Sequence, residues 1–247
     1  MSRSFDILRK SENLPGSFAA RPPLEEFRRP ENHSKARKAI IDEQILTLVQ
    51  RVFVAKDAEK PPDVVAFSGV DSGAGCSWVC ARVSERLAEQ VAGNVCIVDS
   101  NLRTPSLHEY FQVEKGAGFA DAVRDNRPLR EFARRVWGRN LWLISAGNAG
   151  REPNGALNPA SLRKRLAELR AEFAHILIDT PPASSYADAV LLGQLTDGII
   201  LVVGSHSTRR EPARIAKESF QAARIPILGA VLNKRTYPIP EALYQKL

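Results

Sequence analysis

Short apolar runs alternate with helix-like segments from residue 63 onward, and this alternation constrains the fold more than any other feature of the sequence. The runs are rich in Val, Ile and Leu without polar alternation, which is typical of strands buried on both faces. A repeated β–α pattern predicts a doubly wound, mostly parallel α/β sheet with helices on both faces. The strand-like runs are "DVVAFS" at 63–68, "NVCIVD" at 94–99, "LWLIS" at 141–145, "HILID" at 175–179, "GIILVV" at 198–203 and "ILGAVLN" at 227–233.

The chain divides by its pattern into four predicted segments. Residues 1–34 are rich in proline and charge and predict a flexible N-terminal tether. The segment 35–60 is expected to be helical, with apolar residues on one face over about 35–54. An α/β domain is expected over 61–236 and a C-terminal tail over 237–247. No signal peptide or run of ~20 apolar residues is visible, and three cysteines form no paired framework, so we expect a cytoplasmic protein that reaches a membrane only through a partner.

Polar clusters follow four of the predicted strands. They are "SGVDSGAGCS", "DSNLRTP", "DTPP" and "NK". Because ligands of doubly wound sheets bind beyond the carboxyl ends of the strands, these clusters are expected to meet at one edge. A shared anionic ligand is the simplest reason for four such clusters.

The first cluster has the spacing of a phosphate-binding loop but lacks its lysine. Gly73 and Gly75 supply the glycines, Ser77 supplies the hydroxyl that holds Mg²⁺ in such loops, and a predicted helix from Cys76 supplies the N-terminal dipole. Cys76 stands where the lysine is needed, and no Lys or Arg occurs between Pro61 and Ala81. A charge-assisted hydrogen bond contributes roughly 1.5–3 kcal/mol, so its loss predicts weaker nucleotide binding and a larger loss of phosphoryl transfer.

Together the four clusters resemble the cytoplasmic kinase domain of bacterial tyrosine autokinases, the capsular and exopolysaccharide P-loop proteins related to MinD/ParA-type ATPases. The resemblance covers about residues 63–235, and "NLRTP" and "DTPP" carry most of its weight. Its motifs are "CIVDSNLRTPSLHEYF", "LISAGNAGREPNGALNPASL", "HILIDTPPASSYADAVLL", "GIILVVGSHSTRREPARIA" and "ILGAVLNK".

The resemblance implies a role for each matching residue. Ser77, Asp99 and Asp179 would hold Mg²⁺, and Asp99 would also be the base toward a tyrosine hydroxyl. Arg103 would lie near the phosphates or a neighbouring subunit, which completes a catalytic set of Asp99, Asp179 and Arg103. ATP or ADP would be contacted by Gly73, Ala74, Gly75, Cys76, Ser77, Trp78 and Asn233, with Asn233 reading the base.

Several departures from the family pattern alter the expected function. Besides Cys76, Asp71 stands where MinD/ParA relatives carry a second lysine, and Asn101 replaces a second acid. The family's C-terminal tyrosine cluster is reduced to Tyr237 and Tyr244. These changes predict a degenerate, autokinase-like protein that binds ATP or ADP and Mg²⁺ weakly or not at all.

Such a protein would act in exopolysaccharide synthesis or export as a regulatory or docking partner. The partner would be a polysaccharide chain-length-determinant membrane protein or an active kinase paralogue, and no nucleic acid is expected. The alternative is a working tyrosine autokinase or MinD/ParA-like positioning ATPase that takes a cation from elsewhere. The sequence leaves homo-oligomerisation open.

The same residues are also compatible with purely structural roles. The glycine loop is also compatible with an ordinary strand-to-helix turn, Asp99 and Asp179 with helix caps, and Asn233 with a turn cap. Cys76 is expected to be a small filler, with a redox-reactive thiol of lowered pKa as the alternative. Trp78 is expected to pack in the core rather than to stack on a base.

Overall fold

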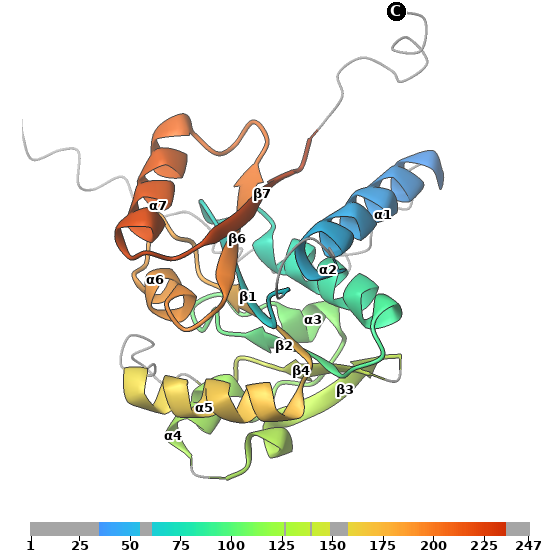
Figure 1. The fold of residues 1–247 in the computed structure, drawn as a ribbon, viewed down its shortest axis with the longest axis vertical. Helices are drawn as coiled ribbons and strands as arrows, with labels where there is room; N and C mark the ends of the chain where they lie inside the picture. The colour runs from blue at the N-terminus through green and yellow to red at the C-terminus, as the bar shows by residue number, and fades with distance from the viewer. Residues whose placement is uncertain (1–34, 55–60, 126, 139, 149–157, 236–247) are drawn as a thin grey trace, which may run out of the picture. The chain divides into compact units, whose positions relative to one another are not determined.

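The computed structural model describes residues 35–54, 61–125, 127–138, 140–148 and 158–235 (Figure 1). The chain divides into two units, Met1–Ile40 and Ile41–Leu247, and the sheet belongs to the second. The predicted tether 1–34 and tail 237–247 lie outside the described residues, and the predicted segments 35–60 and 61–236 stay predictions. Within the described residues, no helix is both long and apolar enough to cross a bilayer.

In the described part of the chain, seven strands form one sheet in the order β3-β4-β2-β5-β1-β6-β7. Neighbouring strands run parallel except β3 and β4, which are antiparallel. The predicted doubly wound, mostly parallel sheet is confirmed. The strands are β1 (Val64–Gly69), β2 (Val95–Asp99), β3 (Ala133–Trp137), β4 (Leu141–Ile144), β5 (His175–Thr180), β6 (Gly198–Gly204) and β7 (Ile227–Asn233).

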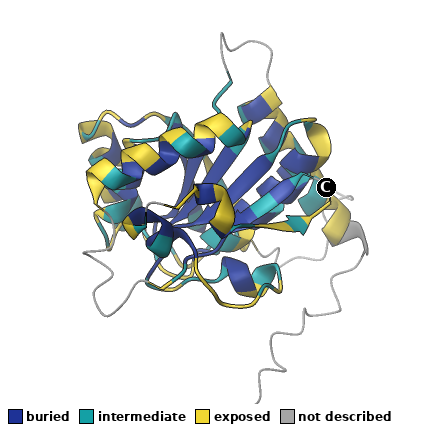
Figure 2. Ribbon diagram, turned by 90° about the horizontal axis from the view of Figure 1, so that it is seen from below, coloured by how far each residue is buried: buried dark blue, intermediate teal, exposed yellow. Residues whose placement is uncertain are grey.

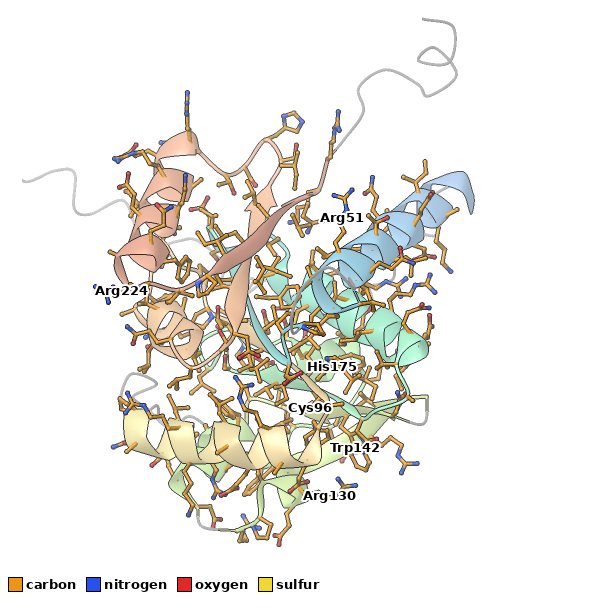
Figure 3. All side chains as sticks on the ribbon, in the orientation of Figure 1. Arg51, Cys96, Arg130, Trp142, His175 and Arg224 are labelled. Atoms are coloured by element: carbon orange, nitrogen blue, oxygen red, sulfur yellow. The ribbon has the colours of Figure 1, made fainter. Side chains whose placement is uncertain are left out.

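The edge strand β3 was not predicted, because it carries no apolar run. Arg134 and Arg135 are exposed on it, as an edge strand allows. The indole of Trp142, on the neighbouring β4, lies under the guanidinium groups of Arg130 and Arg135, 4.6 and 5.0 Å from the ring centre (Figure 3). Charged side chains therefore cover this end of the sheet.

The two predicted helices are both present. The long helix α2 begins at Cys76 as expected, and α1 continues into η2 to give the expected helix over 35–54. The helical elements are α1 (Lys35–Val49), η2 (Gln50–Val54), α2 (Cys76–Gln90), α3 (Leu107–Tyr110), α4 (Phe119–Arg124), η3 (Leu129–Phe132), α5 (Pro159–Glu172), α6 (Asp188–Gly193) and α7 (Arg210–Ala222).

The central strands are buried (dark blue in Figure 2), and apolar clusters lie on both faces of the sheet, which is why these strands lack polar alternation. On β1, Val65 and Phe67 point to a core shared with α1, η2, α2 and α3. Ala66, between them, points to the opposite core with α6 and α7. Helices α4 and α5 cover the rest of that second face. The fold therefore leaves the carboxyl ends of β1, β2, β5, β6 and β7 along one edge.

Candidate functional site

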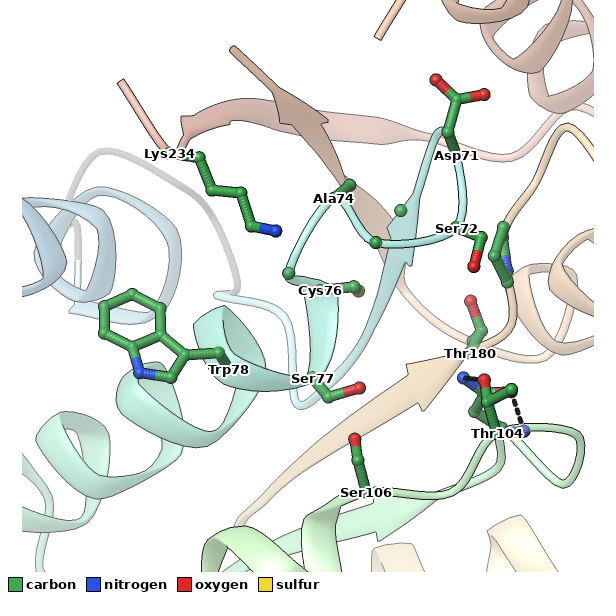
Figure 4. A pocket seen from close by; sticks show the side chains of 15 residues that line it. Asp71, Ser72, Ala74, Cys76, Ser77, Trp78, Thr104, Ser106, Thr180 and Lys234 are labelled. Carbon is green, nitrogen blue, oxygen red and sulfur yellow. Dashed lines mark hydrogen bonds between the residues drawn. The ribbon is translucent and has the colours of Figure 1, made fainter. Parts of the chain in front are cut away.

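The turn between β1 and α2 forms an open loop at this carboxyl edge (Figure 4). Gly73 and Gly75 have φ angles of 79° and 83°, in the left-handed region that favours glycine. At Gly75 a Cβ would also lie 2.3 Å from Nδ2 of Asn233, so no other residue fits without movement. Because α2 begins at Cys76, the unpaired N–H groups of its first turn lie beside the pocket. This backbone geometry is that of an anion-binding cradle.

The pocket joins the four polar clusters, as their positions in a parallel sheet require. Thr104, Ser106, Thr180 and Lys234 also contribute to it, although no role follows from their sequence positions alone. The only sequence signal for them is that they stand within or beside those clusters. The lining residues are Gly69, Asp71, Ser72, Gly73, Ala74, Gly75, Cys76, Ser77, Trp78, Asn101, Thr104, Ser106, Thr180, Pro182 and Lys234.

Asp99 and Asp179 lie opposite each other in the register between β2 and β5, and both are fully buried. Asp99 accepts hydrogen bonds from the backbone N–H groups of Asn101, Ser106 and Leu107 at 3.2, 3.2 and 3.1 Å. Two of these donors begin α3, so Asp99 does serve as a helix cap. Burial, and next the charge of Asp179, still raise the pKa of Asp99 above its ordinary value.

Asp179 differs from Asp99 because neither of its carboxylate oxygens has a hydrogen-bond partner within the described residues. The Ser77 hydroxyl and the Cys76 thiol face it without reaching hydrogen-bond geometry. Burial raises the pKa of Asp179, and these two neighbours oppose the rise only in part. A buried carboxylate without partners is costly, so Asp179 is the group most in need of a cation or a proton.

Cys76 contributes no positive charge to the loop, and its surroundings favour the neutral thiol over the thiolate. Burial, and next the carboxylate of Asp179, raise the pKa of Cys76 well above its ordinary value. The thiolate is the reactive form, so the alternative of a low-pKa redox thiol does not fit this environment. Cys80 and Cys96 are buried free thiols, and Figure 3 places Cys96 within the fold.

Trp78 and Asp71 both line the pocket, and both side chains stand at its edge (Figure 4). Trp78 is 40% exposed, so the expectation that it packs in the core was wrong: it stands on the outer side of the first turn of α2. Its ring lies at the edge of the pocket, away from the hydroxyl of Ser77 (Figure 4). The carboxylate of Asp71 points away from the loop and accepts a hydrogen bond from Oγ of Ser184 at 3.3 Å.

Asn233 connects the last strand to the loop. The side-chain Nδ2 of Asn233 donates a hydrogen bond to the backbone carbonyl oxygen of Ala74 at 2.9 Å. The backbone carbonyl oxygen of Asn233 accepts a hydrogen bond from the N–H of Ser205 at 2.8 Å. The side chain therefore holds the loop, and Asn233, the predicted reader of the base, is not among the residues that line the pocket. The next residue, Lys234, has a φ of 59° and lines the pocket.

Arg103 is not among the residues that line the pocket. Its guanidinium lies 3.9 Å from the ring centre of Tyr186 and forms an ion pair with Asp188, with Nη2 3.3 Å from Oδ2. Asn101 does line the pocket, and its side chain bonds to Thr104. Of the three predicted catalytic residues, the fold thus brings Asp99 and Asp179 together and directs Arg103 elsewhere.

The donor set suits a hard divalent cation. The Ser77 hydroxyl lies beside the buried Asp179, whose oxygens lack partners in the described residues, and Mg²⁺ prefers oxygen ligands from one or two carboxylates together with substrate phosphates. Within the described residues, no group of three or more His, Cys, Asp or Glu side chains forms a self-sufficient metal site. A metal here would depend on ligand oxygens to complete its coordination.

Two proteins that are similar in sequence to this chain are named tyrosine-protein kinases. The tyrosine-protein kinase YwqD of Bacillus subtilis is 26% identical over 196 residues, which cover 79% of this chain and 82% of YwqD. The tyrosine-protein kinase ptk of Acinetobacter johnsonii is 26% identical over 172 residues, which cover 69% of this chain but 23% of ptk. The chain thus spans most of one relative and less than a quarter of the other.

Solved structures share the fold at low sequence identity. The chimeric protein CapA2B2 superposes with a TM-score of 0.75 at 21% identity, over 83% of this chain and 89% of that one. The septum site-determining protein MinD of Pyrococcus horikoshii, solved with Mg-ADP, gives a TM-score of 0.60 at 21% identity, over 74% and 76% of the two chains. These structures confirm the P-loop NTPase fold, and YwqD and ptk confirm the resemblance to bacterial tyrosine kinases.

A family description matches more than half of the chain. It covers residues 63–217, from the start of β1 into α7, and includes the loop and both buried aspartates. The chain therefore belongs to the family described as cellulose biosynthesis protein BcsQ.

Proposed function

We propose that this protein is a catalytically impaired relative of bacterial tyrosine kinases that acts as a regulatory or docking partner in polysaccharide synthesis or export. It keeps a pocket that binds ATP or ADP weakly, and it transfers phosphate poorly or not at all. The observation that carries the proposal is Cys76, whose neutral thiol faces Asp179 at the position where the loop needs a lysine. The charge that develops in phosphoryl transfer thus has no cation from the loop to stabilise it.

Magnesium would be held on the acidic side of the pocket. Ser77 and Asp179 are suited to bind or organise it, with Asp99 fixed beside them by three backbone hydrogen bonds. When bound, the metal would neutralise charge on the phosphates. Asp99 would be the base toward a hydroxyl, although its three N–H partners hold it in place rather than free it to move.

The docking role is supported by the family and the relatives to which the chain is similar. Its family description names cellulose biosynthesis, and its curated relatives are named tyrosine-protein kinases. We propose as partner a polysaccharide chain-length-determinant membrane protein or an active kinase paralogue, through which the chain reaches the membrane. Tyr237 and Tyr244, the remaining candidates for phosphorylation, lie outside the described residues.

Calorimetric titration with ATP and ADP, with and without Mg²⁺, tests the nucleotide part of this proposal. We expect weak binding that Mg²⁺ strengthens, and no labelled phosphate on the protein after incubation with γ-labelled ATP. Cys76→Lys restores a charge-assisted contact of roughly 1.5–3 kcal/mol and is expected to tighten ATP binding by about tenfold to a hundredfold. Cys76→Met, similar in length and without charge, is the matched control. Autophosphorylation of the natural chain at ordinary kinase rates would contradict the impaired-enzyme proposal.

The docking part needs a separate measurement. The natural chain and its Cys76→Lys variant are each co-expressed with the cytoplasmic segments of a chain-length-determinant protein and then co-purified. Both are expected to give a stoichiometric complex, because docking does not depend on the charge of the loop. A complex that forms only with the Cys76→Lys variant and ATP would contradict the docking proposal, because the natural chain would then not bind the membrane protein.

A working autokinase or MinD-like ATPase is the second candidate, and one observation favours it. Asp99 and Asp179 are buried opposite each other, and the Ser77 hydroxyl faces Asp179, which supports a catalytic role for this side of the pocket. This candidate requires a cation from outside the loop or from a neighbouring subunit. Nucleotide-dependent dimerisation by light scattering, together with phosphate on Tyr237 or Tyr244 by mass spectrometry, would support it.

A further inference from the structure

Lys234 stands at the mouth of the pocket, on the opposite side of the loop from Ser77, Ser106 and Thr180 (Figure 4). It follows the last residue of β7, and the side chain extends toward the loop between Ala74 and Cys76 (Figure 4). A Cβ placed on Gly75 would lie 3.6 Å from Cε of Lys234, which puts the ammonium beside the cradle. The described part of the chain gives this exposed ammonium no ion pair, unlike many of the arginines.

The position of Lys234 is held by its neighbour rather than by its own contacts. Asn233 is fixed on both sides, through its carbonyl oxygen to Ser205 and through its amide to Ala74. Lys234 then adopts a φ of 59°, a left-handed conformation that residues other than glycine, Asn and Asp rarely adopt. A strained residue beside a ligand cradle is a reason to ask what its side chain does there.

A phosphate group that binds in this pocket needs a cation beside it, because the nearby charged side chains are mostly acidic. Among the described residues that line it, Lys234 is the one cation, and Asp71 is the one acid. Asp99 and Asp179 are buried next to it. A phosphate group that entered the cradle without Lys234 would meet backbone N–H groups and hydroxyl groups but, among the described lining residues, no positive charge.

We infer that Lys234 is the phosphate-binding cation of this pocket, in place of the lysine missing at position 76, for a ligand of the nucleoside di- or triphosphate class. The inference rests on the nucleotide binding proposed above. The Cys76 side chain enters the pocket from the start of α2 and faces Asp179, whereas Lys234 reaches the loop from β7 on its outer side. A cation on that side strengthens binding without supplying the charge at the acidic side where transfer would occur. Binding and transfer are thereby separated.

Binding measurements on single variants test this assignment. Lys234→Gln is expected to weaken ADP, ATP and pyrophosphate by about tenfold to a hundredfold, because one charge-assisted contact to phosphate is lost. Lys234→Arg is expected to retain most of the affinity. Lys217→Gln, which removes an exposed lysine of α7 outside the pocket, is the matched control and is expected to leave affinity unchanged.

A second variant separates a binding role from a structural one. Glycine is favoured at a φ of 59°, so Lys234→Gly is expected to raise the melting temperature while it lowers ADP affinity as much as Lys234→Gln does. A variant that loses stability and affinity together would overturn the inference.

The remaining outcomes distinguish this inference from the proposed function. If the natural chain binds ADP and Lys234→Gln binds it equally well, Lys234 is not the phosphate cation, while the nucleotide pocket stands. If the natural chain binds neither nucleotide nor pyrophosphate with Mg²⁺ present, the nucleotide part of the proposed function fails, and this inference fails with it.

Discussion

The acidic side of the pocket and its loop side differ in what holds them in place. On the acidic side, two carboxylates are buried against each other, and one of them lacks hydrogen-bond partners in the described residues. On the loop side, a neutral thiol replaces a cation, and the backbone keeps its shape through glycines and Asn233. Burial makes the charged forms of the two acids unfavourable in the folded protein, whereas the loop has a backbone conformation that glycine adopts readily. A chain that keeps the costly half and loses the charge of the other half is expected to use its acids for something other than fast transfer.

The largest effect on the loop side is expected from Gly75→Ala. The new Cβ would meet Nδ2 of Asn233 at 2.3 Å and would also occupy a left-handed φ, so strain and overpacking together are expected to cost about 2–4 kcal/mol of unfolding free energy. Gly73→Ala is the matched control, because its φ is similar and nothing lies within 4 Å of its Cβ position. Urea unfolding of both variants isolates the contact with Asn233, and equal losses in the two would contradict it.

On the acidic side, stability in EDTA is expected to fall as the pH rises. The pKa values of Asp99 and Asp179 are raised in the folded protein, chiefly by burial, so the protonated forms favour folding. That contribution is complete below the unfolded carboxyl pKa of about 4 and is lost as the pH rises through the raised values. Asp179→Asn is expected to flatten this dependence and to gain at least about 1.4 kcal/mol at pH 8, the free energy of one pKa unit.

Chemical denaturation between pH 5 and pH 8.5 measures this difference. Glu114→Gln, which removes an exposed carboxylate outside the pocket, is the control and is expected to keep the slope of the natural chain. A slope that survives in Asp179→Asn would assign the pH dependence to other groups.

The smallest effect is expected at the mouth of the pocket. Trp78→Ala is expected to weaken ADP about fivefold, since stacking on a base contributes about 1 kcal/mol at the low end of its range. Pyrophosphate, which has no base, should bind to the variant and to the natural chain alike. Trp137→Ala, at an exposed tryptophan on the edge strand β3, serves as control. Equal losses for ADP and pyrophosphate would show that Trp78 shapes the loop rather than contacts a base.

The parallel core of the fold was predictable because burial on both faces leaves a plain signal in sequence. Six strands, helix α2 and the meeting of four polar clusters at one edge follow from it. Strand β3 was missed because an edge strand with Arg134 and Arg135 on its surface has no apolar run. The short helices α3 and α4 were missed because four or six residues do not establish a helical period.

Side-chain directions in the site could not be obtained from the sequence. Trp78 and Val79 are neighbours at the start of α2, yet one is exposed and the other buried, because a helix turns by about 100° per residue. The pairing of Arg103 with Asp188 joins residues 85 positions apart and depends on the arrangement of β2 and β5. Lys234 was visible as part of a polar cluster, but its approach to Gly75 follows from the conformation of β7.

The contact between Asn233 and Gly75 bears on how glycine-rich loops should be interpreted. Position 75 must be glycine here because an amide from β7 occupies the space that a side chain would need, whether or not a nucleotide ever binds. Packing alone thus requires glycine at position 75, whereas, among the described residues, no contact of this kind requires a lysine at position 76. A glycine-rich loop can therefore persist for packing reasons alone. Its presence in a sequence indicates the type of loop and does not establish that the loop is active.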